Sequence, residues 1–209
     1  MTYRTRRHGG PWGKLAAMST VKKAARPAKA PRKAREVSLG AQVFAVAADR
    51  LAKRSADAAL FTETGRSWQP WFRWEVLAGC LAAGWTGVPE AAYGQVGVAG
   101  SREKADLLVF DPATGHRVIV ELTIIHDWST NKWIADLNGD TERLRKAAAV
   151  GVAGLQLIVA ASLVSAVEVN DTWKGWLAMS RIWSQPTDMK QALPLGAVGQ
   201  MLVYGWAID

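Results

Sequence analysis

The chain has 209 residues, of which 49% are hydrophobic, so it is long enough and apolar enough to bury the core of a folded domain. This composition excludes a wholly disordered chain. Cys80 is the single cysteine, which excludes a disulfide framework and a cysteine-based zinc site. The three histidines are too scattered to have zinc-ligand spacing, and nothing indicates an oxidising compartment.

The net charge of +8 is concentrated at the N-terminus. Residues 1–36 carry 11 Lys/Arg and one acid, Glu36, which leaves 15 Lys/Arg and 17 Asp/Glu for the remainder. Pro27 and Pro31 oppose a continuous helix, so we predict a flexible, disordered basic arm over 1–36 and one domain over 37–209. Such an arm is typical of phosphate contact, with a solubilising tail or a membrane-surface contact as alternatives. Its candidate nucleic-acid-binding residues are Lys22, Lys23, Arg32, Lys33 and Arg35.

Two segments bear on export and membrane insertion, and both argue against them. Arg6 and Arg7 resemble a twin-arginine signal, but no apolar run of the about 7–15 residues that a signal needs follows them. Residues 147–167 carry no charge, yet glycines at 151 and 154 divide them into a helix end and a buried strand. We expect a cytoplasmic protein without a membrane span. A composition rich in Ala, Gly, Arg and Trp hints at a GC-rich bacterial or phage genome.

Turn and capping residues divide the domain into helices and strands. Gly65 interrupts the first helical pattern, Pro70 suits a first helical turn, and the turn 111–115 joins two apolar runs into a hairpin. In chain order we predict a helix over 38–54, a second helix from an N-cap at Ser67 to Ala83, and strands over 88–93, 105–110 and 117–125. A helix over 131–150, with a potential break at 138–140, and a strand over 155–161 follow. The last two elements are a helix that is capped by Asn170 or Asp171 and carries Trp173 and Trp176, and a strand over 201–208. This order predicts an α/β fold with a mixed central sheet flanked by helices.

Three carboxylates occupy unusual positions in these elements. Asp106 starts an apolar strand and Glu121 lies in the middle of another, where a carboxylate is costly unless it is paired, protonated or bound to a cation. The hairpin places both on neighbouring strands, and alternation puts Thr123 on the same face as Glu121. Glu75 lies on the predicted helix before the hairpin. Its neighbours on the helix surface are mostly small, so its carboxylate has room to extend past them.

Clustered carboxylates and a backbone carbonyl form a hard-oxygen site suited to Mg²⁺ or Mn²⁺. Such a metal lowers the pKa of a bound water and stabilises charge on a phosphoryl group, which suits phosphodiester hydrolysis. The alternative is that Asp106 merely starts its strand and that Glu121 lies on a solvated sheet face beside Arg117.

The stretch 68–163 that contains these carboxylates resembles the PD-(D/E)XK nuclease superfamily, which has the restriction-endonuclease-like fold. The resemblance rests on Trp-Phe-Arg-Trp-Glu75-Val-Leu, Lys-Ala-Asp106-Leu-Leu-Val and Glu121-Leu122-Thr123, followed by a helix and an apolar strand as in the family's αβββαβ core. It implies that Asp106, Glu121 and the Leu122 carbonyl hold Mg²⁺ or Mn²⁺, and that Glu75 orients water or a second metal. It also implies binding of DNA or RNA and cleavage of its backbone.

One position departs from the family motif, which ends in a lysine where this chain has Thr123. Lysine offers a charge that steadies the attacking hydroxide and the phosphate, whereas threonine can only orient water. Lys132, at the start of the next helix, is the first candidate for the missing cation. Lys104 is the second, because it lies two residues before Asp106, and Lys146 is the third. Without such a cation the site is weak or inactive, and the fold only binds.

Aromatic and basic residues near the site are candidates for nucleic-acid contact. Of the 11 tryptophans, most fit the core or an interface. Trp128 lies in a loop after the Glu121 strand and is the candidate for base stacking. Arg102 and Lys104 are candidates for phosphate contact. His126 could transfer protons, although a lone loop histidine is more typical of the surface.

The sequence therefore predicts a Mg²⁺- or Mn²⁺-dependent nuclease that cleaves DNA or RNA, with DNA the favoured partner and a homodimer as an option. The predicted catalytic residues are Glu75, Asp106, Glu121, Thr123 and Lys132. One alternative is a nucleic-acid-binding protein that keeps the nuclease fold without catalysis. Another is a structural or partner protein of a phage or mobile element, with tryptophans at its interface.

Overall fold

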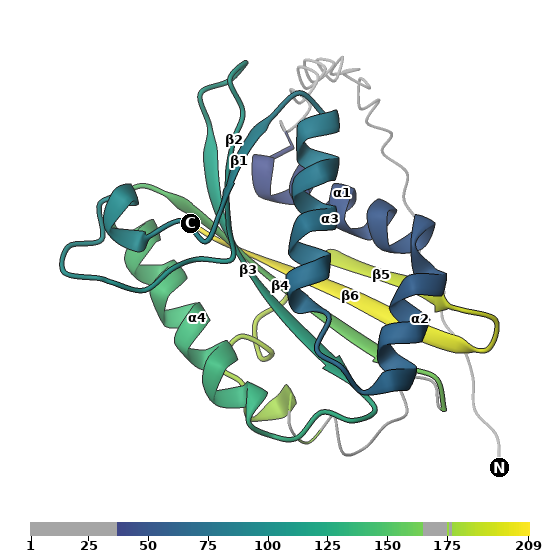
Figure 1. The fold of residues 1–209 in the computed structure, drawn as a ribbon. Coiled ribbons are helices and arrows are strands. Elements are labelled where there is room, and N and C mark those ends of the chain that lie inside the picture. Colours follow the sequence, from purple (N-terminus) through teal and green to yellow (C-terminus); the bar gives the residue numbers. More distant parts are fainter. Residues whose placement is uncertain (1–36, 165–174, 176) are drawn as a thin grey trace, which may run out of the picture. The chain divides into compact units, whose positions relative to one another are not determined.

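A six-stranded mixed sheet is the centre of the structure (Figure 1). The computed structural model describes residues 37–164, 175 and 177–209. The helices are α1 (Leu39–Lys53), α2 (Ser55–Thr64), α3 (Gln69–Ala82), the short 3₁₀ helix η1 (Tyr93–Val96) and α4 (Trp133–Ala148). The strands are β1 (Thr86–Pro89), β2 (Leu107–Phe110), β3 (Arg117–His126), β4 (Ala153–Ser162), β5 (Met189–Leu195) and β6 (Gly199–Ile208). The fold is thus α/β with helices flanking a mixed sheet, as the sequence predicts.

The sheet has the strand order β1-β2-β3-β4-β6-β5. The pair β3–β4 is parallel, with Val118 opposite Ala153 and His126 opposite Ala161, and the other pairs are antiparallel. A parallel pair needs a crossover connection, which α4 supplies. From α3 to β4 the order is helix, three strands, helix and strand.

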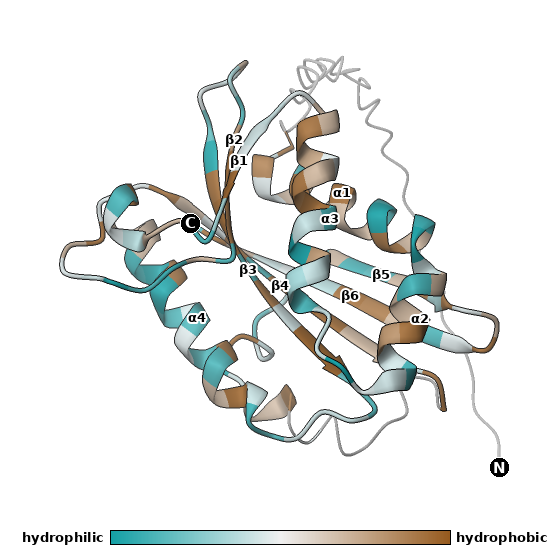
Figure 2. Cartoon of the chain, in the orientation of Figure 1, coloured by the Kyte–Doolittle hydropathy of each residue, from teal (hydrophilic) through white to brown (hydrophobic). Residues whose placement is uncertain are grey.

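Helices cover both faces of the sheet, and the alternation of side chains in β4 shows which helices cover each face. Leu155, Leu157 and Val159 pack in the core beneath α1 and α3, whereas Ile158 and Ala160 pack on the side of α4. Figure 2 shows the hydrophobic central strands in brown and the polar turns of α4 in teal. This alternation explains why β3 and β4 read as nearly continuous apolar runs.

The element boundaries follow local chemistry. Ser38 caps α1, where its Oγ accepts from the Ala41 N–H at 3.3 Å, in agreement with the predicted helix. The predicted Ser67 cap is wrong, because Trp68 holds the N-cap position of α3 and makes no side-chain capping bond. The predicted strand over 88–93 begins two residues too late and ends four residues too late, because β1 spans Thr86–Pro89. After Pro89 the chain turns through Glu90, which has a φ of 53°.

The helix α4 is continuous through Gly139, so the potential break at 138–140 is wrong. The short helix α2 and the edge strand β5 were not predicted. The predicted basic arm over 1–36, with its five named basic residues, lies outside the described residues, as does most of the helix predicted around Trp173 and Trp176. None of the helices in the described ranges combines the length and the hydropathy that a membrane span requires.

Candidate active site

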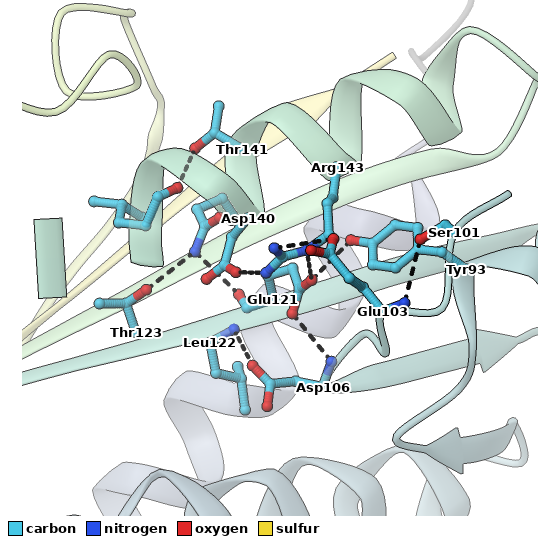
Figure 3. Close-up of polar contacts among 12 residues, drawn as sticks. Tyr93, Ser101, Glu103, Asp106, Glu121, Leu122, Thr123, Asp140, Thr141 and Arg143 are labelled. Carbon is cyan, nitrogen blue, oxygen red and sulfur yellow. Dashed lines mark hydrogen bonds and ion pairs between the residues drawn. The ribbon is translucent and has the colours of Figure 1, made fainter. Parts of the chain in front are cut away.

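Asp106 and Glu121 lie opposite each other at the open end of the β2–β3 hairpin (Figure 3). The register pairs Leu107 with Val120, so the next pair outward is Asp106 with Glu121. The backbone N–H of Asp106 donates to Oε2 of Glu121 at 3.1 Å, and the N–H of Leu122 donates to Oδ2 of Asp106 at 2.8 Å. Each carboxylate therefore binds the backbone of the other's strand, and the predicted juxtaposition is present.

Glu121 is buried, with 2% of its surface exposed. The hydroxyl of Tyr93 donates to its Oε1 at 2.8 Å, and Nε of Arg143 lies 3.5 Å from the same oxygen. Burial, followed by the negative charge of Asp140, raises the pKa of Glu121 to about 8, although the Tyr93 hydrogen bond acts in the opposite direction. The alternative of a solvated glutamate partnered by Arg117 is wrong, because the side chain is enclosed and pairs with Arg143.

The helix α4 brings a second carboxylate and a cation over β3. Asp140 and Arg143 lie about one turn apart and form an ion pair. Burial raises the pKa of Asp140 to about 7, with Arg143 lowering it and the charge of Asp106 raising it. Arg143 also reaches Oε2 of Glu103 at 3.2 Å. One guanidinium therefore serves three carboxylates, including Glu121.

A cavity of about 410 Å³ lies between β3 and α4 and collects these groups. We call it the acidic cavity. The charged and hydroxyl-bearing side chains that define it are Lys104, Asp106, Glu121, Thr123, Asp136, Asp140 and Arg143. Because four acids and two cations line it, the cavity wall has an excess of negative charge when all are ionised.

Thr123 lies on the same face of β3 as Glu121, as alternation predicts, and is nearly buried. Its Oγ1 accepts from Nε2 of Gln156 at 3.3 Å, and the same amide is 3.4 Å from the Glu121 carbonyl oxygen. Oε1 of Gln156 is buried without a hydrogen-bond partner among the described residues. The threonine is therefore held by β4 rather than left free at the cavity wall.

No protein-family model, curated protein sequence or solved structure matches the chain. These comparisons assign no family.

Asp106, Glu121 and the Leu122 carbonyl are the groups that could hold Mg²⁺ or Mn²⁺. Their hard oxygen donors suit either ion, and a divalent cation would balance the like charges that raise the pKa of Glu121. Among the residues that the structure describes, no group of three or more His, Cys, Asp or Glu side chains is arranged to hold a metal. The available donor set is thus two carboxylates and a carbonyl.

The structure does not bring Glu75 to this pair. Glu75 forms an ion pair with Arg50 of α1, and its Oε1 lies 3.7 Å from Nε of Arg54. Gly79, one turn along α3, explains this orientation, because a Cβ there would lie 2.5 Å from Cγ1 of Val46. The small residues that seemed to leave room for the carboxylate instead let α1 approach α3.

Other residues of α3 contact Asp106 instead. Nη1 of Arg73 lies 3.4 Å from Oδ1 of Asp106, and Nε2 of Gln69 donates to Oδ2 at 3.2 Å. Arg73 also pairs with Glu90 at 3.1 Å. Sequence reasoning selected Glu75, the only acid of α3, as a site residue. It missed Arg73, the cation two residues earlier that contacts Asp106.

The three lysines proposed as substitute cations occupy different places. Lys104 lines the acidic cavity, with its Nζ 3.6 Å from Oε2 of Glu90. Lys132 precedes α4 and does not line the cavity. Lys146 lines a second cavity together with Arg102.

The two aromatic candidates near the end of β3 differ in exposure. Trp128 is 67% exposed and lies against Gly65, where a Cβ would be 3.0 Å from its Cγ. His126 is buried at the end of β3, which corrects the expectation of a surface histidine. Burial lowers its pKa, and its Nδ1 accepts from the Trp128 N–H at 3.3 Å. It therefore supports the loop that carries Trp128.

Tyr93, Asp140, Arg143 and Gln156 are site residues that sequence reasoning missed. One signal was present for Asp140. It stands on the buried stripe of α4, between Leu137 and Leu144, where an apolar residue is expected. A carboxylate in a core stripe indicates a paired or functional group.

Proposed function

We propose that the chain is a metal-dependent nuclease that hydrolyses phosphodiester bonds of DNA or RNA, with Mg²⁺ or Mn²⁺ as the cofactor. The observation that carries the proposal is the pair of buried Glu121 and half-buried Asp106, which faces a cavity that is also lined by Lys104 and Arg143. A divalent cation held there would supply a water of lowered pKa and neutralise charge on the phosphate.

The resemblance of 68–163 to PD-(D/E)XK nucleases supports this proposal. The elements α3 to β4 follow the αβββαβ order of that family, and its two acidic motif positions are the pair that meets at the hairpin. The family's lysine is replaced by Thr123. Arg143 and Lys104 offer positive charge at the same cavity and are the substitutes we favour over Lys132.

The roles of the residues follow from their contacts. Asp106, Glu121 and the Leu122 carbonyl would hold the metal, and Tyr93 and the Asp106 N–H orient the Glu121 carboxylate. Because ligand carboxylates must be ionised, Glu121, whose pKa is raised to about 8, would have to lose its proton to bind the metal. Arg143 steadies the excess of negative charge around the reacting phosphate.

The test is cleavage of labelled single- and double-stranded DNA and RNA with Mg²⁺ or Mn²⁺. Asp106→Asn and Glu121→Gln are expected to lower the cleavage rate by about a hundredfold or more, because each removes a charged ligand. Glu142→Gln is the matched control, since Glu142 is an exposed acid of α4 that pairs only with Arg145 among the described residues. Cleavage that persists in both site variants refutes the proposal.

A second function, nucleic-acid binding without catalysis, is favoured by one observation. Arg143 already pairs with Glu121 and Asp140 from within the protein and so occupies carboxylates that a metal would otherwise bind. This alternative predicts binding of DNA that weakens steeply with salt, is largely lost when residues 1–36 are removed, and is accompanied by no cleavage with either metal.

A further inference from the structure

A second cavity of about 410 Å³ adjoins the acidic cavity on the other side of Arg143. It is lined by the loop residues 98–103 and by two residues of α4, Arg143 and Lys146, with Tyr93 beside them. We call it the basic cavity. Because Arg143 lines both cavities and Tyr93 donates to Glu121, the two are separated by little more than one guanidinium and one phenol ring.

The charges of the basic cavity are not all neutralised. Arg143 is engaged by Glu103 at 3.2 Å, as well as by Glu121 and Asp140. Arg102 and Lys146, by contrast, make no ion pair or hydrogen bond with any residue that the structure describes. Two positive charges from different elements thus face one hollow without a carboxylate partner.

The loop supplies a further polar group. Gly97 and Gly100 have φ angles of 98° and 73°, which turn the loop back toward α4. The Oγ of Ser101 accepts from the Glu103 N–H at 3.3 Å, so its own hydrogen is available to donate. An arginine, a lysine and a hydroxyl around one hollow are the donors that bind a phosphate oxyanion.

We propose that the basic cavity binds a phosphate group through Arg102, Lys146 and Ser101. This inference rests on the proposed function for its ligand, an internal phosphodiester of the nucleic-acid strand whose neighbouring phosphate enters the acidic cavity. Inorganic phosphate, or a terminal phosphate, offers the same oxyanion chemistry. Because Arg143 stands between the cavities, it would face the ligands of both.

The test is an NMR titration of the whole chain without divalent metal, so that no cleavage can occur. The probes are inorganic phosphate and a short hydroxyl-ended oligo(dT), whose phosphates are all diesters. The binding variants are Arg102→Gln and Lys146→Gln. Arg145→Gln is the matched control, because it removes the same charge from α4 and its side chain lines neither cavity.

Shifts of the amides over 98–103 are expected in the wild type, with binding weakened about five- to tenfold in each binding variant and unchanged in the control. For the oligonucleotide, the slope of log K against log salt should become shallower by about 0.7 for each phosphate that a variant no longer neutralises. Weakening for the oligonucleotide alone supports an internal diester as ligand. Weakening for inorganic phosphate alone supports a free or terminal phosphate.

Two outcomes overturn the inference. One is the absence of shifts over 98–103 with either probe, and the other is an equal effect of all three variants. A failure of the proposed function is separable from both, because an enzyme that never cleaves DNA can still bind phosphate in this titration. If cleavage depends on Glu121 but phosphate binding is unaffected by the Arg102 and Lys146 variants, the phosphate site in the basic cavity is refuted and the proposed nuclease function stands.

Discussion

Nε of Arg143 on α4 lies 3.5 Å from Oε1 of Glu121 on β3, and this contact ties the helix to the acidic end of the sheet. The same guanidinium pairs with Asp140 and with Glu103. Two of its three carboxylate partners have pKa values raised by burial. The arginine therefore holds in place negative charge that the protein interior would otherwise disfavour.

Replacement of Arg143 by alanine is expected to destabilise the protein in a pH-dependent way. At pH 8.5 the variant leaves the Glu121 and Asp140 carboxylates buried without their cation, which should cost about 3–5 kcal/mol of unfolding free energy. At pH 5.5 both acids hold protons and the loss should be smaller. Urea unfolding at the two pH values measures the difference, with Arg145→Ala as the control. Equal losses at both pH values would contradict this account.

The raised pKa of Glu121 predicts how stability varies with pH. A pKa of about 8 in the folded state exceeds the ordinary value of 4.5, so the folded protein retains a proton that the unfolded chain releases. Stability should therefore fall as pH rises from about 4.5 to about 8, by at most about 1.4 kcal/mol per pH unit for this group. Asp140 acts with the same sign up to about pH 7.

The variant Glu121→Gln isolates this effect, because glutamine can still accept a hydrogen bond but cannot ionise. We expect it to be more stable than the wild type at pH 8.5, and we expect its stability to depend less on pH over 5–8. Urea unfolding across this range compares the two proteins. Parallel curves would show that Glu121 does not titrate in the window.

The hydrogen bond from Tyr93 to Glu121 should also contribute to stability. Tyr93 is fully buried, and its hydroxyl lies 2.8 Å from Oε1. Tyr93→Phe leaves the ionised carboxylate without this donor, so a loss of about 1–3 kcal/mol is expected at pH 8.5. A double-mutant cycle with Glu121→Leu, whose side chain cannot accept a hydrogen bond, measures the coupling. If Tyr93→Phe costs the same in both backgrounds, the hydroxyl does not act through the glutamate.

The hairpin and the acidic pair could be predicted because their determinants are local. The turn 111–115 fixes the register of two apolar runs, and that register sets Asp106 opposite Glu121. The central strands could also be predicted from local sequence. A strand that is buried on both faces of the sheet, such as 155–161, has a continuous apolar sequence.

The two arginines of the site, Arg73 and Arg143, could not be predicted, because their positions depend on how helices dock on the sheet. Helical spacing places Arg143 one turn from Asp140 but does not say which strand that face meets. For α3, the spacing of small residues was consistent with two orientations. The close approach at Gly79 selects the one that turns Glu75 toward α1 and Arg73 toward Asp106.

Trp128 offers a test of nucleic-acid binding that is independent of charge. Its ring is 67% exposed beside the end of β3, and stacking of a base on such a ring contributes about 1–3 kcal/mol. Trp128→Ala should therefore weaken the affinity for single-stranded DNA by about 5- to 150-fold, while the dependence of log K on log salt is unchanged because stacking releases no counterions. Fluorescence anisotropy at several salt concentrations measures both quantities.

The matched control for this variant is Trp74→Ala, because Trp74 is also exposed but lies on α3. Because Trp74 does not line the acidic or the basic cavity, its removal should leave the affinity within about twofold of the wild type. Equal weakening by the two substitutions would indicate a general effect of removing surface aromatics. A changed salt slope in Trp128→Ala would indicate that the substitution displaces the whole loop from the DNA strand rather than only removing the stacked ring.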